Sequence, residues 1–204
     1  CTDEEHSQRS VLSGALVIMG MVVLSQIFGV IRQRVILSYF PDTDYALFLA
    51  AFRLPDIVLE VLAVGVFSSA FIPVFARELK TKERVAWDTA ARVVNIGIVL
   101  FLPIALLFGI FAKEIYSVIT PGFTEAQSQV VANLARILFA AQGFFVVSYV
   151  ITGVLESSQR FFVSALAPLV YNLGIIIGTI LLAPTLGLYA PAVGVLFGAF
   201  GHLL

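Results

Sequence analysis

Long apolar stretches without a charged side chain dominate the sequence. Five of them run for 19 to 23 residues, at positions 11–31, 93–112, 137–155, 161–183 and 186–204. Each is about long enough for an α-helix to cross the roughly 30 Å of hydrocarbon in a bilayer. Their apolar character is continuous, whereas a transmembrane barrel strand alternates over about ten residues. Because a backbone in lipid must satisfy its own hydrogen bonds, we expect these stretches to be helices.

A sixth apolar segment, residues 45–76, differs because it carries three charged residues. Arg53, Asp56 and Glu60 are spaced at i, i+3 and i+7, so they share one stripe of a helix. Pro55 lies among them and can bend the helix by removing one backbone hydrogen bond. A transport cavity needs such a kinked helix with a charged inner stripe, but an ion network that only fixes helix packing has the same pattern.

These segments together predict an all-α polytopic membrane helix bundle with about six transmembrane helices. Only 12% of the residues are charged and 60% are hydrophobic, whereas a soluble domain has about 25% charged residues. We expect a polar cytoplasmic N-terminus at 1–10 and one transmembrane domain at 11–204. Residues 114–136 mix polar and apolar positions after a turn at 120–123, which predicts an amphipathic interfacial helix. The spans are placed at residues 11–40, 45–76, 86–112, 128–155, 161–183 and 186–204.

Basic residues in the predicted loops indicate the orientation in the membrane. If the spans alternate, six bases lie on one side and only Lys113 lies on the other. Because basic loops remain in the cytoplasm, the asymmetry predicts that both ends of the chain are cytoplasmic. The six bases are Arg9, Arg77, Lys80, Lys82, Arg84 and Arg160.

The sequence lacks the patterns that mark common enzyme and cofactor sites. Two histidines and a single cysteine cannot form an ordinary zinc site, and no nucleotide-binding glycine motif or catalytic triad pattern is evident. The net charge of −1 provides no basic field for nucleic acid. We therefore expect no enzymatic activity, no cofactor, no metal site and no nucleic-acid partner.

Charged residues at membrane depth are the candidate site, because placing them in lipid is costly. Arg32 follows the first apolar stretch, and its planar guanidinium suits a phosphate group in a hydrated cavity. The alternative interpretation is an anchor that reaches the lipid headgroups. Arg53 is a second candidate ligand, with Asp56 and Glu60 as cavity ion-pair partners. Asp44 lies at the start of the second span, where a carboxylate also favours the helix N-terminus.

Several motifs in consistent order resemble those of the MurJ/MviN family of lipid II flippases. The family patterns are S-R-x-x-G-x-x-R, T-D-A-F-x-x-A-F-K/R-L-P-N and G-A-F-S-x-A-F-x-P, followed by an A-P-G-F loop, G-x-L-N-x-x-x-R-F and A-P-x-x-x-N. The matching residues here are Gly29, Arg32, Thr43-Asp44, Ala51 to Pro55, Gly65, Phe67-Ser68, Ala70 to Pro73, Pro121 to Phe123, Gly153, Leu155, Arg160-Phe161, Ala167-Pro168 and Asn172.

Members of this family have about 14 helices in two lobes and belong to the multidrug/oligosaccharidyl-lipid/polysaccharide exporter superfamily. The resemblance therefore implies that this chain is one lobe of such an exporter. It implies flipping of undecaprenyl-pyrophosphate-linked peptidoglycan precursor from the cytoplasmic to the outer leaflet of the bacterial inner membrane. Arg32 and Arg53 would hold the pyrophosphate and sugar headgroup, and Asp44 would pair with a base in one conformation. The second lobe would come from the same protein or from a second copy, so the 204-residue chain is not expected to transport alone.

Departures from the motifs affect the charge of the expected cavity. Gln26 replaces the first arginine of the first motif, and Leu59 and Glu60 replace a basic pair that usually follows L-P-N. Fewer cations weaken the attraction to a pyrophosphate. Two alternatives therefore stay open, namely an exporter of another polyprenyl-linked glycan and a non-transporting membrane scaffold with the same fold.

Overall fold

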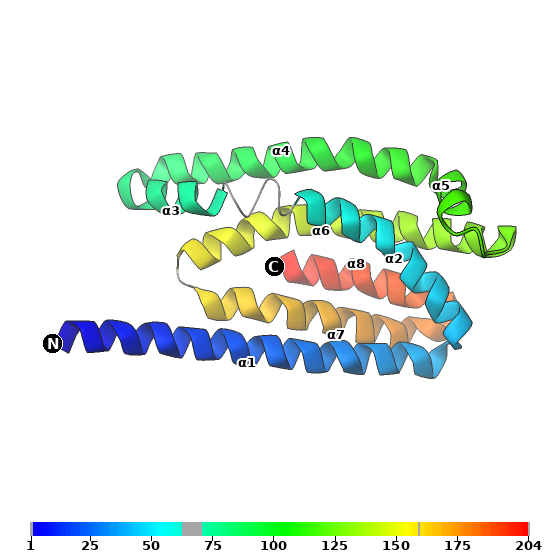
Figure 1. Ribbon diagram of the computed structural model, residues 1–204, viewed down its shortest axis with the longest axis horizontal. Coiled ribbons are helices and arrows are strands. Elements are labelled where there is room, and N and C mark those ends of the chain that lie inside the picture. The colour runs from blue at the N-terminus through cyan, green and yellow to red at the C-terminus, as the bar shows by residue number, and fades with distance from the viewer. Residues whose placement is uncertain (1, 63–70, 159, 204) are drawn as a thin grey trace.

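The computed structural model describes residues 2–62, 71–158 and 160–203, a part of the chain that is helical apart from short turns and contains no strand. The helices form an elongated bundle in which α1, α4, α6 and α7 run side by side along its length (Figure 1). The predicted all-α fold is confirmed, but the described residues form eight helices rather than about six. They are α1 (Thr2–Tyr39), α2 (Asp42–Leu62), α3 (Ile72–Thr81), α4 (Glu83–Ile110), α5 (Ala112–Ile119), α6 (Glu125–Ser157), α7 (Phe161–Leu186) and α8 (Tyr189–Leu203).

Two short helices account for the difference in number. The predicted span at 45–76 contains α2 and the start of α3, a separate amphipathic helix of 10 residues. Helix α5 has 8 residues and follows α4 directly. Both are far shorter than the roughly 20 residues that a membrane crossing requires. Residues 63–70, which include Gly65, Phe67 and Ser68 of the third motif, lie outside the described residues.

The prediction of one interfacial helix over residues 114–136 is wrong, because this range is divided between two helices. Its first part belongs to α5, and its polar residues from Glu125 onward form the first turns of α6. A capping box begins α6, because the Gln127 amide donates to Thr124 Oγ1 (3.3 Å) and the Thr124 amide donates to Gln127 Oε1 (2.9 Å). These bonds satisfy amides that the first turn leaves open, so a single helix of 33 residues continues to Ser157.

The chain is an integral membrane protein. Four helical segments of the described residues are long and apolar enough to cross a bilayer. Helix α8 is apolar but has only 15 residues, which span about 22 Å. The four segments are Met19–Tyr39, Glu83–Ile110, Glu125–Ser157 and Phe162–Leu186.

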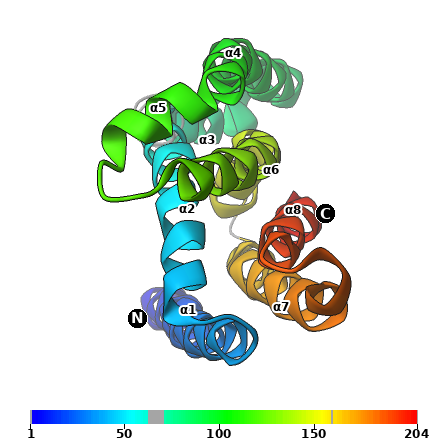
Figure 2. The same cartoon turned by 90° about the vertical axis from the view of Figure 1, so that its right-hand side faces the viewer.

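Helix α6 occupies the middle of the bundle and contacts α2, α3, α4, α5, α7 and α8. In Figure 2 α6 lies between α4 and α8, and α2 lies beside it to the left. Its inner surface includes the fully buried Ala132, Ala135 and Ala141, whose small side chains allow neighbouring helices to approach. Helix α6 therefore connects the α2–α4 side of the molecule to the α7–α8 side.

Helices α7 and α8 form a hairpin with unusually close backbones. A Cβ atom added at Gly174 would lie 2.4 Å from Gly198 Cα, and one added at Gly178 would lie 2.5 Å from Gly194 Cα. Such contacts are possible only between glycines, and they allow the two backbones to pack directly on each other. Gly187 links the helices with a φ of 54°, a conformation that favours glycine. Helix α1 packs along the other side of α7.

Candidate functional site

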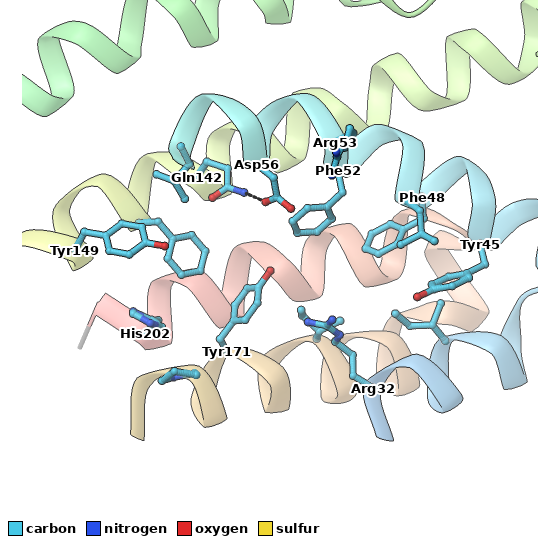
Figure 3. A pocket seen from close by; sticks show the side chains of 16 residues that line it. Arg32, Tyr45, Phe48, Phe52, Arg53, Asp56, Gln142, Tyr149, Tyr171 and His202 are labelled. Carbon is cyan, nitrogen blue, oxygen red and sulfur yellow. Dashed lines mark hydrogen bonds between the residues drawn. The ribbon is translucent and has the colours of Figure 1, made fainter. Parts of the chain in front are cut away.

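A cleft of about 640 Å³ opens between α2 and α6 on one side and α1, α7 and the end of α8 on the other (Figure 3). Its lining combines charged, amide and aromatic side chains, which is unusual for the inside of a membrane bundle. The lining residues are Arg32, Ile36, Tyr45, Phe48, Leu49, Phe52, Arg53, Asp56, Leu59, Gln142, Phe145, Tyr149, Pro168, Tyr171, Ile175 and His202.

Arg32 extends into this cleft from α1 and is fixed by a buried amide. Its Nη1 donates to Asn172 Oδ1 at 2.9 Å, and Asn172 Nδ2 in turn lies 3.4 Å from the Ser25 carbonyl oxygen. Asn172 is only 6% exposed, so it holds the guanidinium at a defined place between α1 and α7. The other guanidinium N–H groups have no hydrogen-bond partner among the described residues, and they can donate to an anionic ligand.

The charged stripe of α2 is only partly directed into the cleft. Arg53 and Asp56 line it, whereas Glu60 and Asp44 do not. Asp56 Oδ1 accepts a hydrogen bond of 2.8 Å from Gln142 Nε2 of α6. Within the described residues Lys113 and Glu125 form the one ion pair, so the predicted pairs between Arg53 and Asp56 or Glu60 are not formed in this structure.

Pro55 interrupts the backbone hydrogen bonding of α2 at the level of this cleft. Proline has no amide hydrogen, so the Ala51 carbonyl loses its partner in the helix. The Tyr116 hydroxyl of α5 donates to that carbonyl at 2.8 Å. Burial raises the pKa of the Tyr116 phenol well above its usual range, so the hydroxyl keeps the proton that it donates. The short helix α5 thus stabilises α2 next to Arg53 and Asp56.

Several uncharged lining residues could not be identified from the sequence. Gln142, Phe145, Tyr171 and His202 come from three helices and meet only through tertiary packing. Gln142 gives one weak signal, since it is the only amide in the apolar stretch 137–155. His202 Nδ1 forms a hydrogen bond with Ser148 Oγ, and its ring packs edge-on to Phe145 at 5.0 Å.

The cleft offers charged and polar groups that can bind a ligand. It presents the Arg32 guanidinium from α1 and the Asp56 carboxylate from α2, and Arg53 also contributes to its lining. Groups of three or more histidine, cysteine, aspartate or glutamate side chains that could hold a metal do not occur in the described part of the chain. An anionic group facing Arg32 is the occupant that this chemistry favours most directly.

Comparison with known proteins places the fold and the motifs in a family. The sequence model of the family described as lipid II flippase MurJ matches residues 37–204, which include Arg53 and Asp56. A probable lipid II flippase MurJ of Aquifex aeolicus is 27% identical over 188 residues, which cover 90% of this chain and 37% of that protein. One from Rhizobium meliloti is 30% identical over 184 residues, covering 86% and 34%. The chain therefore spans about a third of the length of these curated relatives.

A solved structure has the same fold. It is that of a lipid II flippase MurJ in an inward closed conformation, with a TM-score of 0.77 and 23% sequence identity. The match covers 92% of this chain and 40% of the solved chain. The helix arrangement described above is therefore that of one part of a larger bundle.

Proposed function

Because the chain belongs to the lipid II flippase MurJ family, we propose that it forms the N-terminal lobe of a transporter for a lipid-linked peptidoglycan precursor. The substrate is undecaprenyl-pyrophosphate-linked, and it moves from the cytoplasmic to the outer leaflet of the bacterial inner membrane. The protein acts as a transporter in peptidoglycan biosynthesis rather than as an enzyme. The observation that carries this proposal is the cleft in an apolar bundle into which Arg32 is held by Asn172.

The arginines of the cleft act as ligands for the pyrophosphate. Arg32 has free donors and a fixed position, and Arg53 faces the same space from α2. A guanidinium remains charged inside a membrane protein and donates two parallel hydrogen bonds to a phosphate. Asp44, in the first turn of α2, pairs with a base in another conformation of the transporter.

Transport proceeds by alternating access between this lobe and a second one. The relatives are nearly three times as long as the matched region, which supports a second lobe within the same protein. A second copy of the chain is the other source. The loop charges favour a cytoplasmic N-terminus. In the proposed direction of transport the substrate enters the cleft from the cytoplasmic side.

A second candidate function is export of another polyprenyl-linked glycan. Leu59 lines the cleft where the family motif has a base, and Gln26 replaces another expected arginine. A cleft with fewer cations attracts a pyrophosphate less strongly and leaves more of the selectivity to the glycan.

Complementation tests the proposed function. Cells depleted of their own lipid II flippase receive the complete gene product that contains these 204 residues, either unchanged or with Arg32→Ala. We expect growth with the unchanged protein and none with the variant, at equal amounts of protein in the membrane. Normal membrane levels without growth, together with export of a different lipid-linked glycan, would support the second candidate instead.

A further inference from the structure

The cleft has a second polar region, centred on Asp56 of α2, across the cleft from the helix that carries Arg32. The Asp56 carboxylate is exposed in the cleft, and one of its oxygens is fixed by the 2.8 Å bond from Gln142. Gln142 itself is only 2% exposed and is held within α6, so it positions the carboxylate. A carboxylate held in this way is a preorganised acceptor for a donor in the cleft.

Gln142 adds a further unsatisfied acceptor to this region. Its Oε1 is buried and has no hydrogen-bond partner among the described residues. Because this oxygen is fully buried, a ligand in the cleft does not reach it, and Gln142 acts on the cleft through the amide nitrogen that it donates to Asp56. The acceptor that this part of the cleft offers to a ligand is therefore the Asp56 carboxylate.

Aromatic rings surround the two acceptors. Tyr149 extends from α6 beside Gln142, and Tyr171 rises from α7 with its hydroxyl toward Asp56 (Figure 3). Phe145 packs edge-on against Tyr171, with ring centroids 5.1 Å apart. Flat apolar surfaces beside a charged acceptor suit a neutral ligand that has both C–H faces and O–H or N–H edges.

Charge and coordination exclude two other classes of occupant. A second anion at this place would face the Asp56 carboxylate, so a pyrophosphate is directed to Arg32 instead. A hard cation such as Ca²⁺ requires six or more oxygen ligands, whereas Asp56 and Gln142 supply only their side-chain oxygens in a wide cleft. Figure 3 shows Arg32 reaching the cleft from α1, on the side opposite α2 and its Asp56.

We infer that Asp56, positioned by Gln142, forms a sugar subsite whose carboxylate accepts hydrogen bonds from the hydroxyl or acetamido groups of the saccharide on the lipid-linked substrate. This inference rests on the proposed function, because it assumes that Arg32 binds the pyrophosphate. The two ends of the cleft then select different parts of one headgroup. Asp56 contacts the sugar directly, and Gln142 acts as a positioning residue.

Binding of two probes by the complete gene product that contains this chain, in lipid nanodiscs, tests the inference. The probes are undecaprenyl pyrophosphate and undecaprenyl pyrophosphate that carries a disaccharide. We expect about tenfold tighter binding of the saccharide-bearing probe, the contribution expected of one hydrogen bond to a charged group. Asp56→Asn keeps the shape of the side chain and should reduce this preference to below about threefold, without weakening the bare pyrophosphate.

Three further variants test the role of Gln142, the role of Arg32 and the specificity of the effects. Gln142→Leu should remove the sugar preference as Asp56→Asn does, while leaving the affinity for bare pyrophosphate unchanged. Arg32→Ala should weaken both probes equally. Asp88→Asn removes an exposed carboxylate of α4 far from the cleft and should change neither affinity.

The outcomes distinguish the inference from the function on which it rests. Equal binding of the two probes by the unchanged chain, or a full preference in Asp56→Asn, overturns the sugar subsite and leaves the proposed function standing. Failure of both probes to bind overturns the pyrophosphate site, and with it the inference.

Discussion

Two residues of the cleft region, Pro55 and Gln142, leave polar groups that helical hydrogen bonding does not satisfy. Pro55 releases the Ala51 carbonyl, which Tyr116 of another helix captures at 2.8 Å. Gln142 uses its amide nitrogen on Asp56 and keeps its oxygen without a partner among the described residues. The fold completes the first group, whereas the second stays buried without a partner among the described residues. Both lie in positions that line or support the same cleft.

The Tyr116 bond should matter because proline is present. Tyr116→Phe leaves the Ala51 carbonyl buried and unpaired, which we expect to lower the free energy of unfolding by about 1–3 kcal/mol. In a Pro55→Ala background the helix supplies its own amide, so the same change should cost much less. Denaturant unfolding in detergent measures both. Tyr39→Phe, an exposed tyrosine of α1, serves as the control. An equal cost of Tyr116→Phe in the two backgrounds would contradict the explanation.

Among the helices, α7 and α8 depend most on residue size. Four glycines form their closest contact, and the hairpin places Tyr171 and His202 on the same side of the cleft. Side chains at these glycines would force the backbones apart. The position of the cleft residues therefore depends on packing that lies on the far side of α7.

Gly174→Ala tests this dependence. Its Cβ would lie 2.4 Å from Gly198 Cα, and overpacking of this kind typically costs about 1–3 kcal/mol. We expect a lower melting temperature and weaker binding of a lipid-linked pyrophosphate. Gly109→Ala in α4 is the matched control, because an added Cβ there has no atom within 4 Å and alanine favours the helix. A melting temperature for Gly174→Ala equal to that of Gly109→Ala would show that the close approach is unimportant.

Local patterns in the sequence predicted the apolar helices well, because each long apolar stretch contains its own signal. They did not predict where α6 begins, although Thr124 and Gln127 are visible as a capping pair, because the polar turns after them resemble a surface helix. Arg32, Arg53 and Asp56 could be selected by their charge alone. Gln142 and Tyr171 could not, since each is ordinary within its own helix and meets the others only after α6 and α7 pack.

At the scale of the whole molecule, the loop charges predict how the bundle sits in the membrane. With Cys1 replaced by serine, single cysteines at Asp42 and Thr124 should react with a membrane-impermeant thiol reagent added outside intact cells. Cysteines at Lys80 and Ser158 should react only after the cells are opened. The first pair lies in or next to the first turns of α2 and α6, and the second pair lies at the ends of α3 and α6. The opposite pattern at both pairs would reverse the orientation.

In the proposed mechanism a second lobe covers the open side of the cleft. Arg32, Arg53 and Asp56 would otherwise lie against hydrocarbon, at roughly 2.5–3.5 kcal/mol for each charge. Alternating access moves one bundle against another around a shared site, and this chain supplies one bundle. A second lobe, from the same protein or from a second copy, is therefore part of the proposed mechanism.

The transbilayer movement of a fluorescent lipid II analogue in proteoliposomes tests the central claim most directly. The complete gene product that contains this chain should move the analogue, and its Arg32→Ala variant should not. The 204-residue chain should not move the analogue as a monomer, with its mass measured in the same detergent preparation. A monomeric 204-residue chain that moves the lipid, or an Arg32→Ala protein that moves it at the unchanged rate, would contradict the account.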